Sequence, residues 1–112
     1  MVRANSKSLW VRLDYALLHL CLSLSELNLL VSTGLVSIYC QNYIYREKFR
    51  DIEQNLRYIR YDYYDYKIAL SFFDSEIDLG QLIADGKIRT SEYYGLIFCH
   101  KKDIDKFCQR VI

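Results

Sequence analysis

The chain of 112 residues lacks proline altogether and has few glycines, namely Gly34, Gly80, Gly86 and Gly95. Because proline and glycine are the residues that most often interrupt helices, their scarcity favours long helices. The sequence also lacks a charge excess, since its formal net charge is +1 at pH 7. This balance argues against a protein dedicated to nucleic acid, because such proteins usually show a basic excess or stripe.

A spaced framework of cysteines is also missing. The cysteines Cys21, Cys40, Cys99 and Cys108 lie within apolar, helix-periodic sequence. Cysteines in such surroundings are typical of reduced thiols in a buried core, which predicts a cytoplasmic protein. Because no CxxC or HxxxH spacing is present, we expect neither a metal nor another cofactor.

Targeting and membrane segments are not convincing either. The start of the chain has basic residues and an apolar run, but Arg12 and Asp14 interrupt it, unlike a signal peptide. Residues 27–45 are uncharged over a nominally spanning length. Asn28 and Asn42, with several serines and tyrosines, make this stretch poorly apolar. The sequence leaves a core helix and membrane association open, and we favour the core helix.

The most regular feature of the sequence is a heptad pattern between Tyr45 and Phe73, in which apolar residues recur at alternating steps of four and three. This spacing keeps one apolar stripe facing a neighbouring helix. Asn42 occupies the same stripe, where a buried asparagine often fixes the register of paired helices. The interface predicted from this pattern comprises Asn42, Tyr45, Phe49, Ile52, Leu56, Ile59, Tyr63, Tyr66 and Leu70.

The helical pattern begins at Leu24, just after Ser23, which has a glutamate three residues later as in a capping box. We therefore predict one long helix over about residues 24–73, with a length of about 75 Å at 1.5 Å per residue. A leucine-rich helix is expected before it. After it, Ser75 is expected to cap a short helix that stops at Gly86, and Thr90 or Ser91 to cap the last helix.

The sequence therefore predicts a single all-α domain over residues 1–112. It would have four to five helices, dominated by the long heptad-patterned helix, and would form a helical bundle or a coiled-coil dimer. No internal repeat is evident in the sequence. Since a helix of this length is too long for a compact domain of this size, we expect protein–protein interaction as the function: an adaptor, inhibitor or assembly subunit. The partner would be a second copy of the chain, forming a homodimer, or another helical protein.

Nucleic-acid binding is the alternative function. Within residues 43–67, cationic side chains alternate with tyrosines that could stack on bases. The candidate contacts are Arg46, Arg50, Arg57 and Arg60. Acidic residues are threaded among them, and a run of mixed charge is usually a solvated helix face, so this hypothesis ranks second.

A third hypothesis is ribonuclease activity. Arg12 and His19 are separated by six residues, a spacing that resembles the arginine-x(4–6)-histidine motif of small helical ribonucleases of the HEPN class. The resemblance implies a catalytic pair that meets its copy at a dimer interface. Leu13 stands where that motif usually has a polar residue, and the pair lies at the start of the chain. We therefore expect no enzymatic activity.

Overall fold

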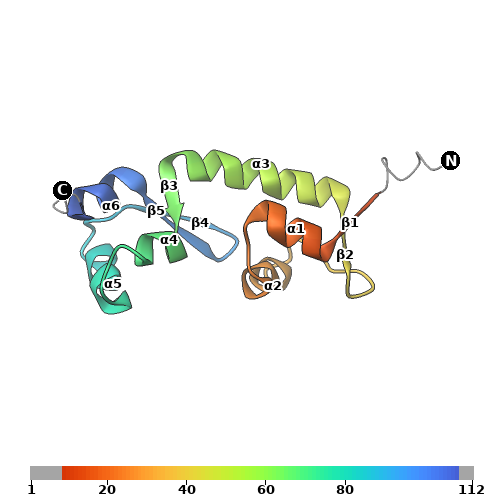
Figure 1. The fold of residues 1–112 in the computed structure, drawn as a ribbon, viewed down its shortest axis with the longest axis horizontal. Helices are drawn as coiled ribbons and strands as arrows, with labels where there is room; N and C mark the ends of the chain where they lie inside the picture. Colours follow the sequence, from red (N-terminus) through yellow and green to blue (C-terminus); the bar gives the residue numbers. More distant parts are fainter. Residues whose placement is uncertain (1–8, 109–112) are drawn as a thin grey trace. The chain divides into compact units, whose positions relative to one another are not determined.

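The computed structural model describes residues 9–108, which form a mixed α/β structure of helices and two antiparallel sheets (Figure 1). The chain divides into two compact units, unit 1 (Met1–Arg57) and unit 2 (Tyr58–Ile112), with the division inside helix α3 (Arg46–Asp62). The prediction of an all-α fold is therefore wrong, and so are the helical bundle and the coiled coil.

Unit 1 combines a two-stranded antiparallel sheet with helices. The sheet pairs Val11 with Ile44, and both side chains are buried. The unit consists of β1 (Trp10–Arg12), α1 (Leu13–Leu20), α2 (Leu24–Ser32), β2 (Tyr43–Tyr45) and the first part of α3. Its buried apolar side chains are Val11, Ala16, Leu20, Leu22, Leu27, Leu30, Val36, Ile44, Phe49, Ile52 and Leu56.

The turn between α1 and α2 has a local chemical cause. Cys21 ends α1 in the left-handed conformation, at φ 55°. Two residues later, Ser23 Oγ accepts a hydrogen bond from the backbone N–H of Glu26 at 3.1 Å. The Glu26 carboxylate accepts in return from the Ser23 N–H at 2.8 Å, so two otherwise unpaired donors of α2 are satisfied. The predicted capping box, and the helix break before it, are confirmed.

The prediction of one long helix over residues 24–73 is wrong. The first helix in this range, α2, ends at Ser32, and Gly34 explains why it ends there. Gly34 has φ +85°, and it follows α2 directly after Thr33. The N–H of Leu35 donates to the carbonyl of Leu30 at 3.1 Å, and the N–H of Gly34 donates to that of Val31 at 3.0 Å. These two bonds form a Schellman motif, which satisfies the last carbonyls of a helix and reverses the chain.

Two further parts of the predicted long helix are strands. Tyr43–Tyr45 is β2, and Tyr63–Asp65 is β3, which interrupts the heptad stripe. Aromatic and β-branched residues fit a pleated surface well, and they form strands wherever a partner strand is available. A three-residue segment shows too little periodicity to distinguish a strand from one turn of helix, so the sequence pattern predicts helix at both places.

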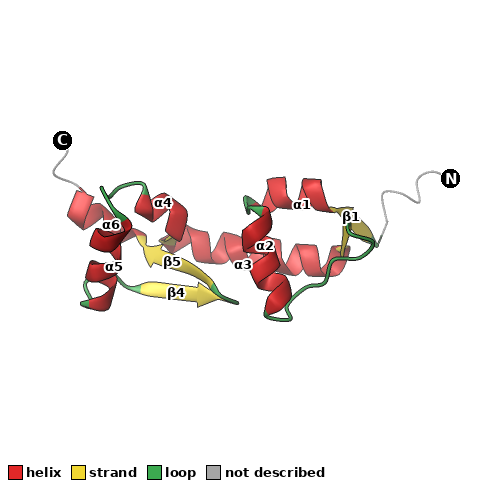
Figure 2. Cartoon of the chain, turned by 90° about the horizontal axis from the view of Figure 1, so that it is seen from below, coloured by secondary structure: helices red, strands yellow, loops and turns green. Residues whose placement is uncertain are grey.

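Unit 2 contains a three-stranded antiparallel sheet in the order β3-β5-β4. The hairpin formed by β4 and β5 is visible in Figure 2. After the end of α3, the unit consists of β3 (Tyr63–Asp65), α4 (Tyr66–Leu70), α5 (Glu76–Ala84), β4 (Thr90–Tyr93), β5 (Leu96–His100) and α6 (Lys101–Cys108). Its core cluster comprises Ala69, Leu79, Ile88, Cys99 and Ile104.

Predictions for unit 2 are partly right. Ser75 caps α5 by accepting from the N–H of Asp78 at 3.3 Å, as expected. The last helix does not begin at Thr90 or Ser91, because both residues lie in β4. Tyr94 and Gly95 connect β4 to β5 with φ of 49° and 94°. Two consecutive positive φ values are the signature of a tight type I′ hairpin turn, and a tyrosine in the first position concealed it.

The two units repeat one order of elements, which the sequence did not reveal. Each has a strand followed directly by a helix, a turn, a serine-capped second helix, a positive-φ glycine and a returning strand that leads directly into a further helix. The strand registers also correspond, since Val11 pairs with Ile44 and Tyr64 with Cys99. Unit 2 adds β4 between its second helix and its returning strand.

Candidate functional site

The residues of the predicted heptad interface have diverse environments. Phe49, Ile52 and Leu56 are 6%, 0% and 1% exposed, so they belong to the buried interior of this chain. Asn42 is exposed, and it precedes β2. The half-buried members are Tyr45, Ile59, Tyr63, Tyr66 and Leu70. The structure therefore does not bring these residues together on one exposed surface, and Asn42 is the one member that is exposed.

The predicted nucleic-acid contacts lie on α3 among acids. Arg50 and Arg57 are exposed on a shallow surface that also carries Glu47, Asp51 and Glu53. Arg46 is half-buried and is the first residue of the helix. Arg60 binds the carboxylate of Asp65 through two hydrogen bonds of 2.8 and 2.7 Å. Such a face has a mixed potential, whereas a phosphate backbone favours an uninterrupted positive one.

Helices α1 and α2 have the geometry of a helix-turn-helix. Their axes are bent by 100° at the three-residue turn Cys21–Ser23. Helix-turn-helix motifs typically show angles of about 90–120° and turns of three or four residues, often with glycine. Cys21 takes the left-handed conformation that a glycine usually supplies there. In DNA-binding examples the second helix enters the major groove, so the side chains of α2 decide whether this motif could bind DNA.

The second helices carry no cations. Along Leu24–Ser32 the charged residue is Glu26, which caps its own helix. Along Glu76–Ala84, the charged residues are Glu76 and Asp78. Helices that read DNA normally supply arginine or lysine to bases and phosphates. The chemistry of these helices therefore resembles a protein-binding surface more closely than a groove-binding one.

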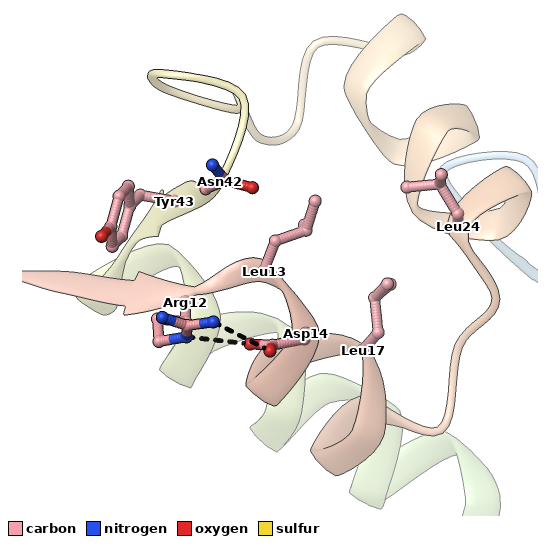
Figure 3. A pocket seen from close by; sticks show the side chains of 7 residues that line it. All are labelled: Arg12, Leu13, Asp14, Leu17, Leu24, Asn42 and Tyr43. Atoms are coloured by element: carbon pink, nitrogen blue, oxygen red, sulfur yellow. Dashed lines mark hydrogen bonds and ion pairs between the residues drawn. The ribbon is translucent and has the colours of Figure 1, made fainter.

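A pocket of about 280 Å³ opens on unit 1 beside this motif (Figure 3). Leu13 and Leu17 of α1 and Leu24 at the start of α2 supply its apolar wall. Arg12, Asp14, Asn42 and Tyr43 supply polar groups beside that wall. The lining therefore has an apolar part, formed by the leucines, and a polar part, the rim, which contains arginine and tyrosine, two residue types enriched at protein interfaces.

An ion pair at the pocket rim fixes its electrostatics. Arg12 Nε and Nη2 donate to the two carboxylate oxygens of Asp14 at 3.2 and 3.1 Å. A further bond comes from the N–H of Tyr15 at 2.7 Å. The hydrogen bonds from Arg12 lower the pKa of Asp14, and those to Asp14 raise the pKa of Arg12. Both groups are therefore charged at neutral pH, and the rim is close to neutral overall.

The proposed ribonuclease pair is divided between two elements. Arg12 is the last residue of β1 and is engaged with Asp14. His19 lies in the last turn of α1, where its ring stacks on Tyr15 with the centroids 4.0 Å apart. The contacts described for the two side chains are thus with different neighbours.

Within residues 9–108, no group of three or more histidine, cysteine, aspartate or glutamate side chains is arranged to hold a metal ion. In the same range, no single helix is both long and apolar enough to cross a membrane, although α1 and α2 together, bent by 100°, reach the required length and composition.

The fold and the pocket thus define a protein with two related strand-and-helix units, one of which carries a helix-turn-helix and a small amphipathic pocket. Comparisons with protein families, curated proteins and solved structures gave no match. Sequence reasoning singled out Arg12 and Asn42, each for a different role, but missed the pocket that they share. Its walls come from three separated segments, and no local pattern marks them.

Proposed function

We propose that the protein recognises another polypeptide through the pocket beside the helix-turn-helix of unit 1. The observation that carries this proposal is the convergence of Leu13, Leu17 and Leu24 on one opening with a polar rim. A volume of about 280 Å³ lies just below the range of small-molecule sites, which typically span about 300–1,000 Å³. It suits an anchoring side chain of a partner better than a cofactor.

The proposed interaction surface is the pocket of unit 1, and not the heptad stripe that the sequence predicts as the interface. Phe49, Ile52 and Leu56 are buried within the chain, and so they cannot contact a partner without unfolding. Leu24, by contrast, is 51% exposed although it is a large apolar residue. The partner is a second copy of the chain or another protein.

The test uses two exposed leucines that differ in their relation to the pocket. Leu24 lines it, whereas Leu18 is 74% exposed and does not. Affinity capture from the native source, with mass spectrometry, would compare wild type, Leu24→Asp and Leu18→Asp. Aspartate is favourable in the first turn of a helix, so Leu24→Asp is expected to fold.

We expect partners captured by wild type and by Leu18→Asp to be lost with Leu24→Asp. If the partner is a second copy, light scattering of the pure proteins will show an oligomer for the first two and a monomer for the third. Retention of the same partners by Leu24→Asp would refute the proposal.

DNA binding is the second candidate, favoured by the 100° angle and three-residue turn between α1 and α2. It predicts binding of duplex DNA that weakens steeply with salt and is reduced by Asn28→Ala on the exposed side of α2. If the arginines of α3 were responsible instead, Arg57→Ala would weaken binding. Fluorescence anisotropy at low salt with no signal would remove both versions.

A further inference from the structure

The correspondence between the units shows how the pocket of unit 1 differs from the same place in unit 2. Leu13 is the first residue of α1, and Tyr66 is the first residue of α4. Leu24 likewise begins α2, and Glu76 begins α5. Two of the three leucines that line the pocket therefore correspond to a tyrosine and a glutamate.

In unit 2 that tyrosine and glutamate are joined. The hydroxyl of Tyr66 donates to Glu76 Oε2 at 3.2 Å. The Tyr66 ring packs against the core cluster of unit 2 and is half-buried. Burial, and then the negative charge of Glu76, raise the pKa of Tyr66, so the hydroxyl keeps its proton. An aromatic ring with a polar tip thus spans the starts of the two helices.

In unit 1, leucines occupy both of these places, and neither can form such a bridge. The opening retains an apolar wall and a rim that both donates and accepts hydrogen bonds, from Arg12, Asp14 and Asn42. A phenol complements this surface, because its ring is apolar and its hydroxyl can donate and accept. The neutral ion pair at the rim favours a neutral polar tip over a charged one.

We propose that the pocket of unit 1 receives a tyrosine side chain from a partner polypeptide, next to the leucines that stand where unit 2 has the hydrogen-bonded pair Tyr66 and Glu76. This inference rests on the proposed function and specifies the anchor of the partner. The ring lies against Leu13, Leu17 and Leu24, and the hydroxyl meets the polar rim.

The probe is 4-methylphenol, the isolated side chain of tyrosine, with toluene as the comparison. Amide signals of the isotope-labelled protein are followed by NMR during titration. We expect saturable shifts at Leu13, Leu17, Leu24 and Asn42 with 4-methylphenol. Binding of toluene should be weaker by about tenfold, since toluene cannot form a hydrogen bond with the rim. Equal or tighter binding of toluene would overturn the phenol assignment, and absence of shifts with both probes would overturn the site.

A variant that copies unit 2 supplies the matched control. Leu13→Tyr combined with Leu24→Glu is expected to fill the pocket from within and to weaken 4-methylphenol binding by about tenfold or more. Leu18→Tyr, away from the pocket, should bind as wild type does. If the double variant fails to fold, Leu24→Trp is used instead, because Leu24 is exposed and a larger side chain there covers the opening. Unchanged binding by a folded, filled variant would contradict the inference.

The proposed function and the tyrosine anchor can be refuted independently of each other. If Leu24→Asp loses its captured partners while 4-methylphenol does not bind, then the pocket recognises protein through another kind of anchor. If 4-methylphenol binds but Leu24→Asp keeps every partner, then the phenol site exists and the proposed function is wrong.

Discussion

Arg60 and Asp65 form a two-point ion pair in which Nε and Nη2 of the arginine donate to the two carboxylate oxygens at 2.8 and 2.7 Å. Asp65 is the buried charged residue of the described chain, at 6% exposure. It ends β3 immediately before α4, while Arg60 lies in the last turn of α3. The pair therefore fixes the sharp change from α3 into the strand.

Asp65→Asn should destabilise the protein, because it removes the negative charge that the guanidinium of Arg60 binds at two points. Losing one member of a buried pair typically costs 3–5 kcal/mol, and the partial exposure of Arg60 reduces our expectation to about 2 kcal/mol. Urea unfolding at neutral pH measures the loss. Arg57→Gln, at an exposed position of the same helix, should change stability by less than about 0.5 kcal/mol. Equal effects of both variants would show that the pair is not stabilising.

Alanine substitutions at different glycines are expected to change the stability of the protein in opposite directions. Gly34 and Gly86 end α2 and α5 with φ of +85° and +77°, whereas Gly80 lies inside α5. An added Cβ meets nothing within 4 Å at any of the three, so the backbone conformation decides the outcome. Alanine at either of the first two should cost about 1 kcal/mol, and Gly80→Ala should stabilise by up to about 1 kcal/mol. Thermal unfolding of the three variants tests the order.

Sequence reasoning worked where the signal was local. The capping box at Ser23 and the N-cap at Ser75 depend on residues three apart, so they can be predicted without knowing the tertiary structure. The stop at Gly86 was predicted on similar grounds. Gly34 has the same role, but it lies inside the apolar pattern of the predicted long helix, which continues beyond it.

The strands could not be predicted from local signals. Tyr63 to Asp65 is a strand because β5 offers it a partner about 35 residues later, with Tyr64 opposite Cys99. The heptad stripe was real, but its residues Phe49, Ile52 and Leu56 face the interior of their own chain. An apolar stripe has the same spacing whether its partner is another chain or the same one. The pocket was missed because Leu24 and Asn42 approach it from distant parts of the sequence.

Leu56→Ala tests the intramolecular role of the stripe. Leu56 is 1% exposed, and truncating a buried leucine to alanine typically costs 2–5 kcal/mol. We expect about 3 kcal/mol in urea unfolding, independent of protein concentration. Tyr58→Ala, at a side chain that is 84% exposed, should change stability by less than about 0.5 kcal/mol. A loss that grows on dilution would indicate that Leu56 stabilises an oligomer instead.

The cysteines should separate by reactivity. Cys99 is fully buried, and its burial raises the pKa of the thiol to about 11. Cys21 and Cys40 are exposed. Because the thiolate is the reactive form, iodoacetamide at pH 8 should modify Cys99 at least about tenfold more slowly than Cys21 or Cys40. Peptide mass spectrometry over time measures the rates, and the difference should vanish in denaturant. Fast labelling of Cys99 in the folded protein would contradict its burial.

The stability of the protein should depend on pH in the acid range, because Asp103 has a lowered pKa in the folded state. Its carboxylate accepts from Arg89 Nε at 2.9 Å, from Nη2 at 3.0 Å and from the Arg89 backbone N–H at 2.8 Å. The side-chain bonds from Arg89, and then the backbone bond, hold the pKa of Asp103 well below its ordinary value of 3.8. A depressed pKa means that the unfolded state binds the proton more readily than the folded state.

The contribution of Asp103 to stability is therefore fully present above about pH 5 and is lost as the pH falls below the ordinary pKa of aspartate. Asp103→Asn should lower the melting temperature at pH 7, and its curve should converge with that of wild type as the pH approaches 2. Calorimetry across this range measures both curves. Asp51→Asn, at an exposed position on α3, should leave the curve close to that of wild type. Parallel curves for wild type and Asp103→Asn would show that the charge of Asp103 is not coupled to folding, because only a coupled proton changes the difference between them with pH.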